Sequence, residues 1–119
     1  MSHDDSRLPR RLTLDLAGAV AETMQALSTP SRLLILDRLR GSSLPVAELA
    51  AAVGMEQSAV SHQLRVLRHL GLVRGERRGR QVIYGLHDPH VGDLLDEAVG
   101  HIEHLRLGRR ATERIAEAS

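Results

Sequence analysis

The scarcity of aromatic side chains is the feature that most constrains what this chain can fold into. Tyr84 is the only aromatic residue among 119, and the chain has no Phe or Trp. Leu, Val, Ile and Ala must therefore fill the core, and they dominate the 42% of residues that are hydrophobic. Such a core favours packed helices over an aromatic-rich β sandwich. We predict one domain of mainly α, α+β structure.

Composition also excludes several classes of protein. Cysteine is absent, so disulfides, thiolate metal sites and thiol redox sensing are excluded. No apolar run approaches the ~20 residues of a membrane span, and the N-terminal segment lacks the apolar centre of a signal peptide. We therefore expect a cytoplasmic protein with no membrane partner.

Positive charge is concentrated in one stretch of the chain. The net charge is only +1, yet six arginines and a single acidic residue lie between positions 65 and 80. A local basic stretch indicates a directed anionic partner such as the DNA backbone. The alternative is a solvated surface that is rich in arginine.

Hydrophobic periodicity and turn residues predict a single domain without an internal linker. A flexible arm is expected at 1–12, a folded domain at 13–107, and a tail at 108–119 that continues the last helix or frays. Helices are expected over 14–27, 30–41, 45–54, 57–70 and from 88 to at least 107. Strands are expected at 72–74 and 81–86.

The middle of this order predicts a winged helix-turn-helix. The helices over 45–54 and 57–70 are joined by a short turn that contains Gly54. The two strands enclose a turn rich in glycine and arginine, which is typical of a two-stranded wing. The last helix is expected to serve as a C-terminal dimerisation helix.

The second of these helices has one apolar and one polar side. On a helical wheel, Leu64 and Leu67 fall within about 40° of Val60 and predict the buried stripe. The opposite side has side chains that can bind bases and phosphates in the major groove. The candidate DNA-binding residues there are Gln57, Ser58, Ser61, His62 and Arg65, and those of the wing are Arg77, Arg78 and Arg80. The alternative for the helix alone is an ordinary solvated face.

The stretch from Glu48 to Leu86 resembles the DNA-binding core of the ArsR/SmtB family of metal-sensing repressors. The run SAVSHQLRVLRHLGLV is its most specific part, and the resemblance extends over about residues 16–107. The resemblance implies a homodimer that binds double-stranded operator DNA and is released when metal binds. It also implies that the residues at 57, 58, 61, 62 and 65 contact DNA.

The same resemblance implies a metal site on the last helix. Some members of the family use an Asp-x-His pattern near its start and two side chains near its end, which here are Asp88, His90, His101 and His104. Residues 90 and 101 lie ~16 Å apart along a helix axis, so one helix cannot bring these ligands to one ion.

Two antiparallel copies of the helix solve this problem. Pairing residue 90 with 101 and residue 88 with 104 implies one crossing point near residue 96, so a symmetric dimer would hold two identical sites. The alternative is that Asp88 only caps the helix, and that the histidines are ordinary surface residues.

The identity of the metal depends on further donors. Three imidazoles and a carboxylate suit tetrahedral zinc. The runs MEQSAVSHQLRVLR and DPHVGDLLDEAVGHIEHLRLG resemble the actinobacterial nickel/cobalt sensors of the family, so nickel or cobalt is favoured and zinc is the alternative. His3 and a free Ser2 amine could complete a six-coordinate site.

Three other functions compete with this interpretation. The first is a regulator of the same fold that responds to a signal other than metal. The second is a metalloenzyme, which is disfavoured because four protein ligands fill the site and no candidate base stands beside it. The third is a winged helix that binds protein instead of DNA.

Overall fold

The computed structural model describes residues 11–118. His3 and most of the arm predicted at 1–12 lie outside these residues. The described chain forms, in order, α1 (Leu14–Ala26), α2 (Pro30–Gly41), β1 (Leu44–Pro45), α3 (Val46–Val53), α4 (Gln57–His69), β2 (Val73–Arg78), β3 (Gln81–Leu86) and α5 (Pro89–Ala118). This order confirms the predicted winged helix-turn-helix.

Local chemistry explains where the helices begin and end. The hydroxyl of Thr13 accepts a hydrogen bond from the Leu16 backbone amide at 3.1 Å and caps α1. Pro30 opens α2, where its missing amide hydrogen carries no cost. Gly54 ends α3 with φ at +69°, a left-handed conformation that glycine adopts without strain. The turn between α3 and α4 therefore depends on this glycine.

The core is aliphatic, as the composition predicts. Seven large side chains from α2, α3, α4 and β2 are fully buried, and Tyr84 only packs half-buried against them. Each buried aliphatic side chain contributes about 1.5–3 kcal/mol relative to an exposed one. The fully buried set consists of Ile35, Leu36, Leu49, Val60, Leu64, Leu67 and Val73.

The sheet has three antiparallel strands in the order β1-β3-β2, one more than the predicted two-stranded wing. The extra strand, β1, pairs Leu44 with Tyr84 and is too short to show an alternating pattern. A Cβ at Gly85 would lie 2.5 Å from the Ser43 Oγ, so glycine permits this close approach. Strand β2 also continues to Arg78, past the end predicted at Arg74, because the hairpin closes through a two-residue turn.

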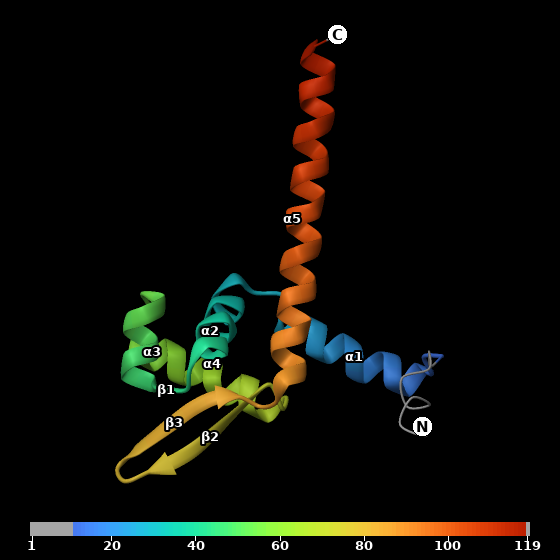
Figure 1. The fold of residues 1–119 in the computed structure, drawn as a ribbon. Helices are drawn as coiled ribbons and strands as arrows, with labels where there is room; N and C mark the ends of the chain where they lie inside the picture. The colour runs from blue at the N-terminus through green and yellow to red at the C-terminus, as the bar shows by residue number, and fades with distance from the viewer. Residues whose placement is uncertain (1–10, 119) are drawn as a thin grey trace, which may run out of the picture.

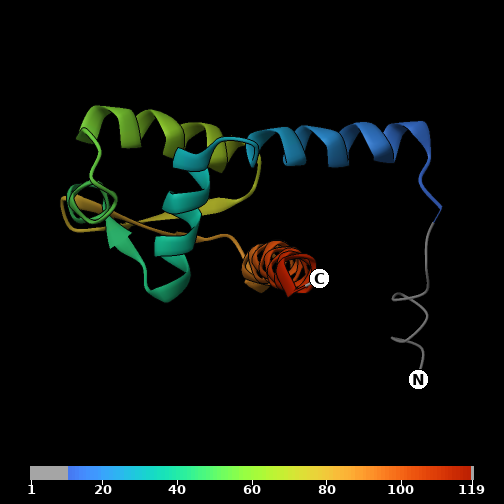
Figure 2. The same cartoon turned by 90° about the horizontal axis from the view of Figure 1, so that it is seen from above.

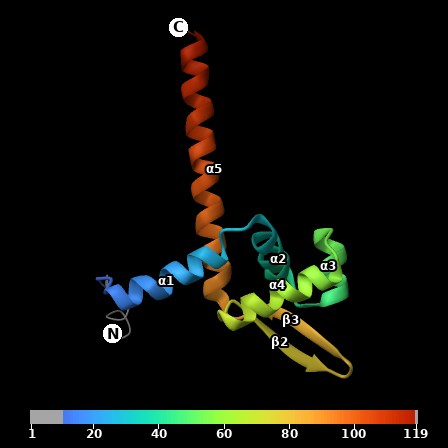
Figure 3. The ribbon, with the colours of Figure 1, turned by 180° about the vertical axis from the view of Figure 1, so that it is seen from behind.

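Two helices project from the body that the other elements form (Figure 1). Helix α5 stands away from the wing and continues as helix past Leu107, and α1 extends to another side (Figures 1 and 3). Seen from above, α1 and α4 lie nearly in line along one side, with α2 beneath their junction (Figure 2). Within residues 11–118, no helix is long and apolar enough to cross a membrane.

Candidate functional site

Helix α4 is oriented by its buried stripe. Val60, Leu64 and Leu67 are at most 1% exposed and face the core. The opposite side is open: four of the five candidate DNA-binding residues of α4 are exposed, and Ser61 is half-buried. Helix α3 packs against α4, and the exposed polar side is open to a ligand. Contacts of these side chains with bases stay a prediction.

The wing carries its arginines at the tip. Arg78 pairs with Gln81 across the hairpin, and Gly79 takes a φ of +64° in the turn between them. Arg77, Arg78 and Arg80 are all exposed. The guanidinium of Arg78 lies 3.3 Å from the Glu76 carboxylate, so part of its charge is compensated within the wing. Phosphate contact by the wing arginines is likewise a prediction.

Arg74 has a structural position and lies outside this basic tip. Its Nε donates a hydrogen bond to the Leu86 carbonyl oxygen at 3.2 Å. The bond spans the two strands at the base of the wing, where Val73 pairs with Leu86. Arg74 thus helps hold β2 against β3.

Asp88 and His90 lie together at the start of α5. The Asp88 Oδ1 accepts a hydrogen bond from the His90 backbone amide at 2.9 Å and lies 3.3 Å from the His90 Nδ1. The His90 side chain is 91% exposed, whereas that of Asp88 is 40% exposed. Asp88 therefore does cap the helix, and its carboxylate also faces the imidazole.

His101 and His104 are exposed on the half of α5 that projects from the body. In the part of the chain that the structure describes, no three His, Asp or Glu side chains gather closely enough to hold one ion. The donor types of Asp88, His90, His101 and His104 fit a divalent transition metal, and their assembly into one site from two chains stays a prediction.

The described protomer leaves two apolar surfaces uncovered. On α1, Leu16, Val20 and Met24 recur every four residues and are 38–50% exposed. On α5, Ile102 and Leu105 are 46% and 45% exposed. Helices that present such stripes to water usually bury them against a partner.

Sequence reasoning missed the ion pair that joins α5 to α2. The Arg40 guanidinium on α2 binds the carboxylate of Asp96 on α5, and also that of Asp37 at 2.6 Å. The spacing of Arg40 and Asp37 is typical of a helical ion pair. No local pattern could have found Asp96, which lies 56 residues from Arg40.

Comparison with known proteins identifies the family to which this winged helix-turn-helix chain belongs. Residues 29–74 match the family described as "bacterial regulatory protein, arsR family". The chain is 66% identical over 92 residues to the HTH-type transcriptional regulator NmtR of Mycobacterium tuberculosis, and the match covers 77% of each chain. This chain belongs to the ArsR family.

Solved structures of ArsR-family proteins agree with the fold. The solution structure of apo-NmtR aligns with a TM-score of 0.68 at 61% identity over 82% of each chain. A homodimeric winged helix-turn-helix DNA-binding domain from Mycobacterium bovis aligns at 0.71 with 34% identity, over 76% of this chain and 85% of that one. The antimony-specific transcriptional repressor AntR aligns at 0.73 with 36% identity, over 86% and 94%.

Membership in the ArsR family confirms two predictions. The chain is a transcriptional regulator that binds DNA through a winged helix-turn-helix, and it is not an enzyme. The similar domain from Mycobacterium bovis is described as homodimeric; a homodimer of this chain, with the exposed stripes of α1 and α5 as its contact surfaces, stays a prediction.

Proposed function

We propose that this protein is a cytoplasmic repressor that binds operator DNA as a homodimer and is released when nickel or cobalt binds, with zinc as the alternative. Each metal ion would be held by Asp88 and His90 of one protomer and by His101 and His104 of the other. One observation carries the proposal: four donors flank an exposed apolar stripe on α5 at spacings that only a second, antiparallel copy can close.

The angular order of side chains around α5 supports this pairing. Val91 and Leu95 bury one side of the helix against the body. Ile102 continues this side of the helix beyond the body, where it is exposed. Leu105 follows about 60° further round, and the three histidines follow about 100–160° from Ile102. A second helix seated on Ile102 and Leu105, beyond the body, would therefore lie next to the histidines.

The donor set supports a transition metal. Three imidazole nitrogens and one carboxylate oxygen suit zinc, nickel and cobalt, and when bound the ion would cross-link the two α5 helices. Nickel and cobalt often take more than four ligands, which the Ser2 amine and His3 could supply. A related member of the family, AntR, is described as antimony-specific, so a repressor of this fold can be selective for one element.

Release from DNA requires that α5 influence α4. The Arg40 guanidinium joins Asp96, near the proposed crossing point, to α2, and α2 packs against α3 in the helix-turn-helix. Cross-linking of the two α5 helices would thus be transmitted through α2 to both recognition helices. A differential affinity of about 1–3 kcal/mol between the two states suffices for such coupling.

Operator binding measured during metal titration tests the proposal. Fluorescence anisotropy would follow a duplex from the promoter upstream of the protein's own gene, with nickel, cobalt and zinc added separately. We expect nickel or cobalt to weaken binding by about tenfold or more, equivalent to about 1.4 kcal/mol. His101→Ala combined with His104→Ala should abolish this effect.

The matched control is His69→Ala, which removes an exposed histidine of α4 outside the proposed ligand set. The control should leave the response to metal intact. Tight operator binding that no metal alters would contradict the proposal, and would favour the competing function of a regulator with a different signal. Deletion of residues 2–4 should reduce the nickel response but spare zinc binding if the N-terminus supplies ligands.

A further inference from the structure

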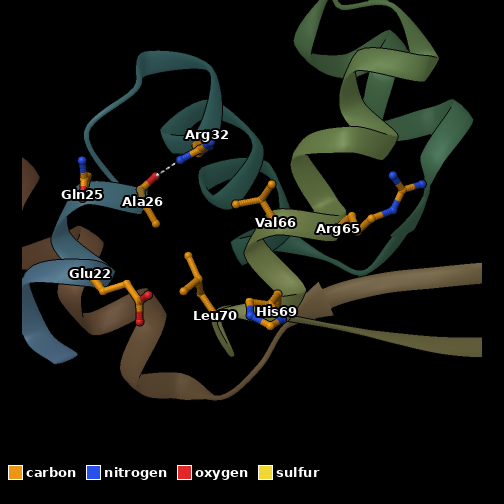
Figure 4. A pocket seen from close by; sticks show the side chains of 8 residues that line it. All are labelled: Glu22, Gln25, Ala26, Arg32, Arg65, Val66, His69 and Leu70. Atoms are coloured by element: carbon orange, nitrogen blue, oxygen red, sulfur yellow. Dashed lines mark hydrogen bonds between the residues drawn. The ribbon is translucent and has the colours of Figure 1, made fainter.

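Arg32 joins three helices through one side chain. From α2, its Nε donates a hydrogen bond to the Gln63 Oε1 of α4 at 2.7 Å. Its Nη1 donates a second hydrogen bond to the Ala26 carbonyl oxygen at the end of α1, at 3.3 Å. Both bonds are partly buried, and Figure 4 shows the guanidinium reaching Ala26. Arg32 therefore lies where the end of α1 and the middle of α4 approach α2.

Direct packing between α1 and α4 is interrupted at this place. An open groove of about 600 Å³ lies between them, lined from the α1 side by Glu22 and from the α4 side by Val66 and His69 (Figure 4). Ala26 is the only buried residue of α1. The rest of α1 projects from the body, so the angle between α1 and α4 depends on contacts at this one end.

That angle matters because the two helices have different tasks. Helix α1 exposes Leu16, Val20 and Met24, the apolar surface that we expect the second protomer to cover. Helix α4 has the polar side that we expect to face DNA. In a homodimer, the angle between the two therefore sets the separation of the two α4 helices, which must match half-sites about 34 Å apart.

We propose that Arg32 is a positioning residue for operator binding. Its fork holds α4 and the end of α1 in one relative orientation, and so fixes the spacing of the two recognition helices. The proposal rests on operator binding by a homodimer, and it holds whether or not metal is the signal. Lysine could not replace Arg32, because a single ammonium group lacks the planar fork that spans two separate acceptors.

Gln63 can affect DNA binding only through the position of α4. On the helical wheel it lies about 60° from Val60, beside the buried stripe and far from Ser58 and Arg65. Its side chain is half-buried and engaged by Arg32. Loss of operator affinity in a Gln63 variant would therefore report on helix placement instead of a lost base contact.

Operator binding by single and double variants tests this role. Arg32→Lys, Gln63→Leu and the double variant would be titrated against two duplexes: the complete operator from the promoter of the protein's own gene, and the same duplex cut to one half-site. Arg38→Lys is the matched control, since Arg38 is an exposed arginine of the same helix. Thermal unfolding of each dimer would be recorded in parallel.

We expect each single variant to bind the complete operator about tenfold more weakly, while half-site binding changes by less than about threefold. The double variant should bind the operator no more weakly than the more weakly binding of the two single variants, because both changes break the same interaction. Arg38→Lys should bind like the unaltered protein. If Arg32→Lys fails to fold, Gln63→Leu still provides the comparison between the two duplexes.

Three results would overturn the proposal. The first is wild-type operator affinity in Arg32→Lys, which would show that charge alone suffices. The second is an equal loss on the complete operator and the half-site, which would place the defect within one recognition helix. The third is strictly additive losses in the double variant, which would show that Arg32 and Gln63 act independently.

Discussion

Removal of two wing arginines should change the salt dependence of operator binding by an amount that the structure allows us to estimate. Arg77 and Arg80 are exposed at the wing tip and have no ion-pair partner among the described residues, whereas Arg78 lies beside Glu76. Their charges are therefore fully available to phosphates. We consider the variant in which both Arg77 and Arg80 are replaced by Gln.

The magnitude follows from counterion release. Each phosphate that a protein neutralises contributes about −0.9 to the slope of log affinity against log salt. Two arginines on each of two protomers make four such contacts, so the slope should become less steep by about 3.6. When salt rises from 50 to 200 mM, the factor by which operator affinity falls should then be about 150 times smaller than in the unaltered protein.

Fluorescence anisotropy over a salt series measures this slope directly. The matched control is Arg109→Gln with Arg110→Gln, which removes the same charge from the part of α5 that lies far from the wing (Figure 1). The control should leave the slope unchanged, and Arg78→Gln should reduce it less than Arg77→Gln does. An unchanged slope in the Arg77 and Arg80 variant would refute phosphate contact by the wing.

Three further predictions concern core packing, backbone conformation and base contact. Leu64→Ala should lower the free energy of unfolding by about 2–5 kcal/mol in denaturant titration, whereas Leu34→Ala, at a half-exposed position, should lower it far less. Gly54→Ala should destabilise the dimer by about 1–2 kcal/mol, because φ is +69° at this position. Gly100→Ala in α5 should instead stabilise the dimer by up to about 1 kcal/mol, because a Cβ there meets nothing within 4 Å. Arg65→Ala should weaken operator binding by about 1–3 kcal/mol and relax the sequence preference at one base position. Competition with operator variants would reveal this change. Uniform weakening on every sequence would argue for a phosphate contact.

Most of the fold could be predicted because its signals are local. Pro30 and Gly54 mark the start of α2 and the end of α3, and the apolar spacing of Val60, Leu64 and Leu67 identifies the inner side of α4. Strand β1 was missed because two residues cannot show a period, and its pairing with β3 spans about a third of the chain. Long-range pairing of short segments leaves no trace in a sequence window.

In the candidate site, too, local patterns could be predicted from the sequence and long-range contacts could not. The exposed side of α4 and the basic wing tip follow from periodicity and charge. The bonds of Arg32 to Gln63 and of Arg40 to Asp96 join elements 31 and 56 residues apart, so only the folded chain reveals them. The proposed metal ligands are a third case, since they depend on a second chain. Sequence spacing suggests that pairing.

The central claim is that each metal ion bridges two protomers, and complementation between two inactive variants tests it most directly. One chain would carry Asp88→Ala and His90→Ala, and the other His101→Ala and His104→Ala. Neither homodimer would contain a complete site, but a mixed dimer, purified through two different affinity tags, would recombine the intact halves into one site. We expect equilibrium dialysis to show about one tightly bound ion per mixed dimer and none in either variant homodimer. A mixed dimer that binds no ion, while the unaltered dimer binds two, would contradict the account.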